Sequence, residues 1–131
     1  MTKQEINTIN TSTLAYLGDA IYELFIRERI IKKGSSPKVD VLHKESIHYV
    51  NAGAQSKAIK TMMDENFLTE EEFVVAKRAR NHKTATKAKN ADPVDYKWAT
   101  ALEALIGWLK LNNQEDRMTE VLEKAAEILE R

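Results

Sequence analysis

The chain has 131 residues, of which 20 are basic and 20 acidic, and it contains no cysteine. This length fits a single hydrophobic core, and 43% hydrophobic with 31% charged residues is typical of a soluble globular protein. The lack of cysteine excludes disulfides, thiolate zinc sites and cysteine nucleophiles. No apolar run approaches the roughly 20 residues needed to cross a bilayer, and the polar N-terminus has no signal-peptide core, so we expect a cytoplasmic protein.

The spacing of apolar residues predicts an all-α fold. The first helix is expected from about Leu14 to Lys33, where leucine and isoleucine recur at helical intervals and Gly34 stops the helix. The hydroxyls of residues 11–13 offer N-caps for this helix. Further helices are expected at about 41–50, 52–64, 70–80, 93–111 and 115–130, with a possible kink near residues 51–53.

Two of these helices have clear starting signals. Thr69 and Glu72 form a capping box, and Asp92–Pro93 places a cap residue before a proline in the first turn. The helix at 93–111 is apolar over a wide face, so we expect it at the centre of the bundle. Together these elements predict one compact helical domain over residues 1–131, with a core at about 12–112 and a C-terminal helix at about 115–130.

The charges are unevenly distributed. The segment from Lys77 to Asn90 holds six lysines and arginines and no acid, so the rest of the chain is net acidic. Such a basic segment is typical of a surface that binds a polyanion, although a charge run between helices can also be an ordinary solvated surface. The candidate RNA-binding residues in and around it are Lys77, Arg78, Arg80, Asn81, His82, Lys83, Lys87 and Lys89.

Two acids interrupt apolar helices, Asp19 in the first and Glu103 in the helix at 93–111. A lone buried carboxylate is costly, so each needs a partner, a proton or a cation. Small residues one turn away, such as Ala15 and Gly107, allow a close helix crossing at which the two carboxylates meet. Two carboxylates at one point repel each other unless a divalent cation lies between them. Hard oxygen ligands of this kind favour Mg²⁺ or Mn²⁺. The alternative is that Asp19 caps a kinked helix and Glu103 pairs with a lysine.

Other residue types offer no further chemistry. The three histidines lack metal-ligand spacing, and no glycine-rich phosphate loop or nucleophilic triad is present. The aromatic residues at helical spacing are expected in the core rather than as platforms for bases; they are Tyr16, Tyr22, Phe25, Trp98 and Trp108.

Two segments resemble known motifs. The run from Leu14 to Glu23, with Leu-Gly-Asp-Ala at its centre, resembles the signature helix of the ribonuclease III endonuclease domain. The run from Thr100 to Gly107 resembles the second acidic motif of that family, and the order and separation of the two runs also fit. The nearest subgroup is Mini-ribonuclease III, in which the catalytic domain stands alone without a double-stranded RNA-binding domain.

The resemblance implies a Mg²⁺-dependent endoribonuclease, with Mn²⁺ as a substitute, in which Asp19 and Glu103 are the catalytic and metal-binding residues. It implies a homodimer that cleaves double-stranded RNA to 5′-phosphate and 3′-hydroxyl ends. The substrate implied is the precursor of 23S ribosomal RNA, with a possible ribosomal protein helper.

The sequence also departs from the full-length family. Its accessory acids are replaced here by Ser12, Ala15 and Thr100, which favours a single metal ion per site. The departures leave two alternatives open: a catalytically silent RNA-binding or ribosome-associated module of the same fold, and a helical protein-interaction domain with an acidic partner.

Overall fold

The computed structural model describes residues 1–34, 36–82 and 92–131. Across these ranges every regular element is a helix, which confirms the predicted all-α class. None of these helices combines the length and apolar content that a bilayer crossing requires. In chain order the elements are α1 (Lys3–Asn7), α2 (Thr11–Lys33), α3 (Val39–Val50), α4 (Ala52–Asp64), α5 (Glu70–Asn81), α6 (Pro93–Leu111) and α7 (Glu115–Leu129).

Helix α2 begins earlier than the apolar pattern indicates. Its N-cap is Asn10, whose side chain accepts a hydrogen bond from the Ser12 amide at 2.8 Å, so the hydroxyls of residues 11–13 lie inside the helix. Asparagine is at least as good an N-cap as serine or threonine, which explains the shift. The helix then continues through Asp19 without interruption to Gly34, whose φ of 69° ends it. The interpretation of Asp19 as a cap at a kink is therefore wrong.

The short helix α1 has no counterpart among the predicted elements, because five residues are too few to show periodicity. Thr2 and Glu5 form a capping box, and Ile6 inserts into the core. Asn7 then accepts two hydrogen bonds from distant helices, one on its side chain from Trp108 Nε1 at 2.8 Å and one on its carbonyl from Arg78 at 3.0 Å.

The remaining boundaries follow the local signals closely. Asn51 ends α3 and caps α4, so the possible kink is a complete break between two helices. The predicted capping box of Thr69 and Glu72 is present at the start of α5. The Asp92 side chain accepts hydrogen bonds from the amides of Val94 and Asp95, at 2.8 and 3.2 Å, and so starts α6.

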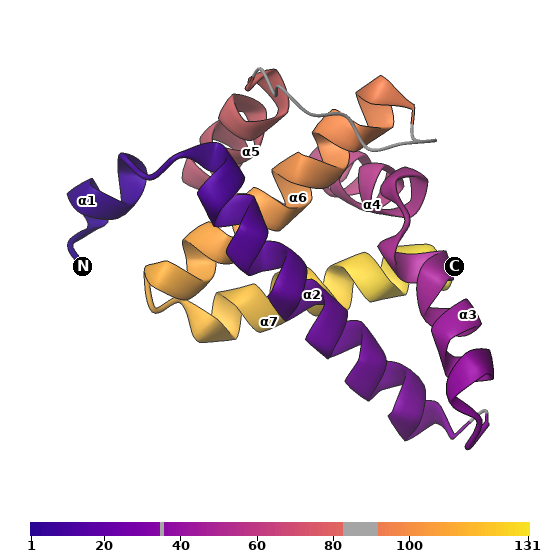
Figure 1. Cartoon of the computed structure of the whole chain (residues 1–131). Helices are drawn as coiled ribbons and strands as arrows, with labels where there is room; N and C mark the ends of the chain where they lie inside the picture. The colour runs from indigo at the N-terminus through magenta and orange to yellow at the C-terminus, as the bar shows by residue number, and fades with distance from the viewer. Residues whose placement is uncertain (35, 83–91) are drawn as a thin grey trace.

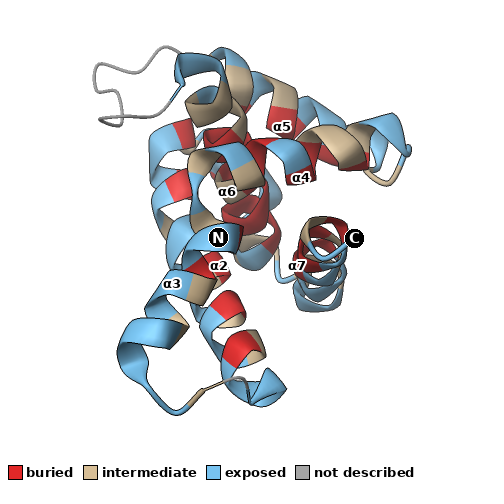
Figure 2. Ribbon diagram, turned by 90° about the vertical axis from the view of Figure 1, so that its right-hand side faces the viewer, coloured by how far each residue is buried: buried red, intermediate tan, exposed pale blue. Residues whose placement is uncertain are grey.

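Helix α6 occupies the centre of the bundle, as its wide apolar face predicts. It packs against α2, α4, α5 and α7, most extensively against α2, and Figure 1 shows α2 and α6 crossing near the middle of the molecule. Nearly every α6 residue from Ala99 to Leu109 is buried. Figure 2 shows buried residues concentrated between the inner helices, whereas α3 is mostly exposed.

Candidate active site

The crossing of α2 and α6 brings two backbones into contact. A Cβ atom added at Gly18 would lie 1.7 Å from the carbonyl oxygen of Glu103, and one added at Gly107 would lie 2.1 Å from the carbonyl oxygen of Leu14. Only glycine leaves room for this approach, because any side chain would overlap backbone atoms of the facing helix. The crossing therefore sets Asp19, the neighbour of Gly18, directly beside Glu103.

Asp19 and Glu103 lie close enough for the negative charge of Asp19 to act on the carboxyl group of Glu103. Asp19 is exposed, whereas Glu103 is partly buried against the core. Burial and the negative charge of Asp19 raise the pKa of Glu103 to about 8, with a smaller contribution from Glu23 one turn further along α2. Within the described ranges Glu103 has no lysine or arginine partner, so the lysine-pairing alternative does not hold there.

Gln55 on α4 is a third residue at this point and was absent from the residues predicted from sequence. It is only 4% exposed, its Nε2 donates to the Val50 carbonyl at 2.9 Å, and its amide lies close enough to Glu103 to lower the pKa of that carboxyl in opposition to burial. Its Oε1 has no partner among the described residues. A signal was present in the sequence: Gln55 shares the buried face of α4 with Ala58, Ile59 and Met62, where an apolar residue is expected.

The donor set suits one divalent cation. Asp19 and Glu103 supply hard carboxylate oxygens at one point, and a cation between them would offset the repulsion that, together with burial, raises the pKa of Glu103. No cluster of three or more acid, histidine or cysteine ligands occurs in the part of the chain that the structure describes. Two of the accessory positions add no charge. Ala15 is buried, and the Thr100 hydroxyl donates to the Tyr96 carbonyl at 3.0 Å.

The predicted RNA-binding residues do not all come together. Lys77 and Arg80 approach the ring of Trp98, at 5.9 and 5.1 Å from its centroid. Arg78 instead donates to the Asn7 carbonyl of α1. Asn81 accepts from Arg80 at 2.7 Å, and His82 follows at the end of α5. The remaining candidates, Lys83, Lys87 and Lys89, lie outside the described residues.

The aromatic residues divide into three groups. Tyr22 and Trp108 are fully buried, as predicted, and Phe25 and Trp98 are partly buried against the core. Tyr16 contradicts the prediction, since it is 83% exposed. The reason is helix rotation: Tyr16 lies on the face of α2 that points away from α6, a direction that periodicity alone does not reveal.

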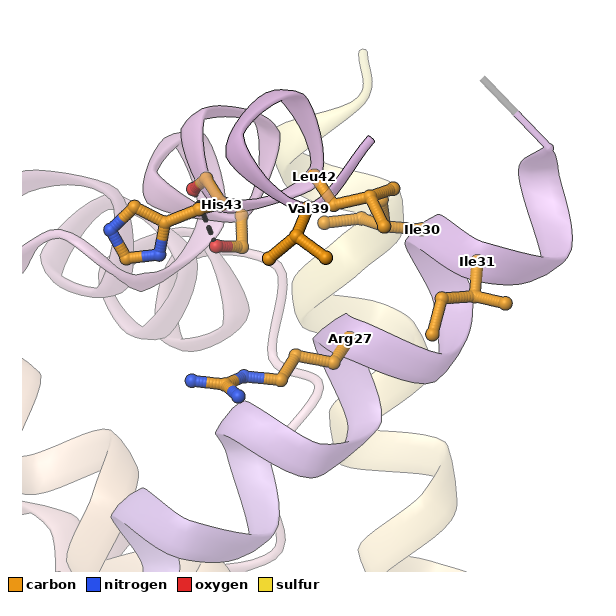
Figure 3. Close-up of a pocket in the computed structure, with 7 residues that line it drawn as sticks. Arg27, Ile30, Ile31, Val39, Leu42 and His43 are labelled. Carbon is orange, nitrogen blue, oxygen red and sulfur yellow. Dashed lines mark hydrogen bonds between the residues drawn. The ribbon is translucent and has the colours of Figure 1, made fainter. Parts of the chain in front are cut away.

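A separate, mainly apolar pocket lies between α2 and α3, with a volume of about 210 Å³. Figure 3 shows Ile30, Ile31, Val39 and Leu42 around it, with Arg27 and His43 at its margin. His43 is engaged there through its backbone, because its carbonyl accepts a hydrogen bond from the Ser46 hydroxyl at 2.7 Å. This pocket contains none of the predicted site residues.

Comparisons with known proteins identify the family of this chain. The family model of the ribonuclease III domain matches residues 12–114. Mini-ribonuclease 3 of Clostridium tetani is 44% identical over 129 residues, covering 98% of this chain and 84% of that protein. Mini-ribonuclease 3 of Brevibacillus brevis is 45% identical over 134 residues, covering 99% of this chain and 98% of that protein.

A solved structure is also similar. The crystal structure of a Fusobacterium nucleatum protein superposes with a TM-score of 0.80 at 35% identity, covering 94% of this chain and 96% of that one. The chain belongs to the ribonuclease III domain family and, within it, to the Mini-ribonuclease 3 group.

Proposed function

We propose that the chain is a Mg²⁺-dependent endoribonuclease that cleaves double-stranded RNA and matures the ends of the 23S ribosomal RNA precursor. Membership of the ribonuclease III domain family makes it an endoribonuclease. The observation that supports Asp19 and Glu103 as its catalytic residues is their meeting at a glycine-lined helix crossing, where each carboxyl would otherwise face a like charge.

The proposed roles follow from the exposure of each group. Asp19 and Glu103 would hold Mg²⁺, which when bound supplies a Lewis acid that activates water and offsets charge on the reacting phosphate. Asp19 is exposed and so accessible to a phosphodiester, whereas Glu103 is partly buried beside Gln55. Water attacks phosphorus in line with the bond to the 3′ oxygen, which leaves a 3′-hydroxyl and a 5′-phosphate. Mn²⁺, with similar oxygen preference, is expected to replace Mg²⁺.

The basic residues are proposed to bind the duplex on either side of the scissile bond. Contacts to phosphates supply most of the affinity in protein–nucleic acid complexes, and proteins recognise A-form RNA by its shape and its 2′-hydroxyls. Each site cuts one strand, so cleavage of both strands requires a homodimer. Assistance by a ribosomal protein and a cytoplasmic location remain part of the proposal.

The decisive test replaces each carboxylate by its amide. We expect Asp19→Asn and Glu103→Gln to abolish cleavage of an RNA duplex in Mg²⁺ while the circular dichroism spectrum stays helical. Both variants should still bind the duplex, and EDTA should stop cleavage by the unmodified protein. Unchanged cleavage by either variant would refute the mechanism.

The same assay separates the alternatives. A silent RNA-binding module would bind the duplex without cutting it in Mg²⁺ or Mn²⁺. A protein-interaction domain would neither bind the duplex nor gain melting temperature with either cation, since only a ligand of the folded state raises that temperature.

A further inference from the structure

Three cationic side chains from two helices gather around one indole ring. The Nζ atoms of Lys60 on α4 and Lys77 on α5 each lie 5.9 Å from the ring centroid of Trp98 on α6. The Arg80 guanidinium of α5 lies 5.1 Å from the same centroid. Lys77 also lies 5.9 Å from the ring of Phe73. We call Lys60, Lys77, Arg80 and Trp98 the Trp98 cluster.

The positive charge of this cluster has no acidic counterpart among the described residues. The ion pairs of the described chain involve other lysines and arginines. Because all three cations surround one ring, their separations are comparable to the Debye length of about 8 Å at physiological ionic strength. They therefore repel one another and act together on any nearby anion.

The indole explains how the cations are held together without an anion. A lysine or arginine over the face of an aromatic ring is attracted by its quadrupole, most strongly by that of tryptophan. Trp98 is itself partly buried against the core, so its position is fixed by packing. Side chains that are oriented before binding lose less conformational entropy when an anion arrives.

The cluster is close to the carboxylate pair along two helices. On α4, Lys60 follows Gln55 by five residues, and on α6, Trp98 precedes Glu103 by five residues. Five residues of α-helix span about 7.5 Å of axis. The cluster and the carboxylate pair are therefore neighbours along both helix axes.

We propose that the Trp98 cluster is a contact for the phosphate backbone of double-stranded RNA beside the carboxylate pair. This inference rests on the proposed function and adds Lys60 and Trp98 to the residues expected from sequence. Lys77 and Arg80 also begin the acid-free segment from Lys77 to Asn90, which favours a polyanion with many evenly spaced charges over a short acidic peptide. Lysine and arginine bind phosphate oxygens by charge-assisted hydrogen bonds, while Trp98 positions them.

The test is a titration of the full chain with a fluorescent RNA duplex in EDTA at several KCl concentrations. Neutralising one phosphate contact lowers the slope of log affinity against log salt by about 0.9. We therefore expect Lys60→Gln to lower that slope by about 0.9 and to weaken binding by about five- to tenfold near 0.1 M salt. Lys60→Arg should restore both values. Lys44→Gln on α3, which lies at the opposite end of the molecule from α5 in Figures 1 and 2, is the charge-matched control and should change neither.

A double-mutant cycle tests the positioning role of Trp98. Trp98→Leu removes the ring but no charge, and it should weaken RNA binding. If Trp98 holds Lys60 in place, adding Lys60→Gln to Trp98→Leu should cost less affinity than Lys60→Gln costs alone. Additive losses would contradict the positioning role.

The titration distinguishes failure of the proposed function from failure of the cluster proposal. If the unmodified chain binds no duplex RNA, both the proposed function and the cluster proposal are overturned. If it binds and cleaves the duplex but Lys60→Gln behaves as Lys44→Gln does, only the cluster proposal fails, and an acidic protein partner becomes the better explanation of these cations.

Discussion

At the scale of single residues, Gly18 controls the geometry of the candidate site. The Cβ of any other residue would lie 1.7 Å from the Glu103 carbonyl oxygen, which is a backbone atom and has no way to move aside without shifting α6. Glycine inside a helix costs about 1 kcal/mol relative to alanine. The close approach that it permits is what allows an exposed acid on α2 to meet a partly buried acid on α6.

Gly18→Ala is therefore expected to destabilise the protein despite its better helix propensity. We expect a loss of about 3 kcal/mol or more in the free energy of unfolding, measured by urea titration, because the two helices must separate. Gly53→Ala on α4 is the control, since its new methyl group would meet only the Asn51 side chain at 3.3 Å and Asp95 at 3.8 Å. Equal stabilities of the two variants would contradict this account of the crossing.

At the scale of elements, buried and half-buried ion pairs attach α7 to the rest of the bundle. Arg117 of α7 donates to both carboxylate oxygens of the buried Glu72 on α5 and to the Phe67 carbonyl. At the other end of α7, Glu130 accepts from Arg29 and Lys33 of α2 and from Tyr49 of α3. The C-terminal helix α7 and the residue that follows it are thereby attached to α2, α3 and α5, all of which are distant from α7 in the sequence.

The pairing of Glu130 predicts a dependence of stability on pH. The hydrogen bonds from Arg29, with further ones from Lys33 and Tyr49, lower the pKa of Glu130 to about 2 from its usual 4.5. A carboxyl whose pKa is depressed in the folded state contributes stability above pH 4.5 and loses it as pH falls toward 2. We expect Glu130→Gln to be less stable than the unmodified protein at pH 7 in urea titrations, and the difference to narrow by pH 3. A difference that stays constant over this range would mean that Glu130 does not stabilise the fold through its charge.

At the scale of the whole molecule, one face of α2 is left without a partner in the described chain. Tyr16 and Leu24 are 83% and 60% exposed, and their spacing places them along one side of the helix together with Ala20. This apolar stripe lies next to Asp19 and Glu23, so a second copy packed on it would bring two carboxylate sites close together. The stripe is thus the surface that suits the proposed homodimer.

The dimer proposal is tested by placing a charge on the stripe. We expect Leu24→Glu to shift the protein from dimer to monomer in sedimentation experiments, because a buried, unpaired carboxylate at an interface is costly. Val74→Glu on α5, at a site 63% exposed, is the matched control and should leave the dimer intact. An unmodified chain that sediments as a monomer, or a dimer that tolerates Leu24→Glu, would exclude this interface.

The sequence by itself determined the local features of this protein. The bounds of α4 and α6, the capping box of Thr69 and Glu72 and the stop at Gly34 depend on residues within one or two turns of each other, so they can be recognised from spacing. The two acidic motifs can also be recognised from the sequence, because each is a run of a few neighbouring residues.

Only the tertiary structure decided which surfaces meet. Three features depend on helices that are far apart in the sequence. They are the different exposure of Asp19 and Glu103, the proximity of Gln55 to Glu103, and the approach of Lys60 to Trp98. The exposure of Tyr16 and the bond from Arg78 to α1 depend in the same way on helix rotation. The physical reason is that the rotation and crossing of each helix are set by the packing of the whole core, whereas periodicity specifies only which residues share a face.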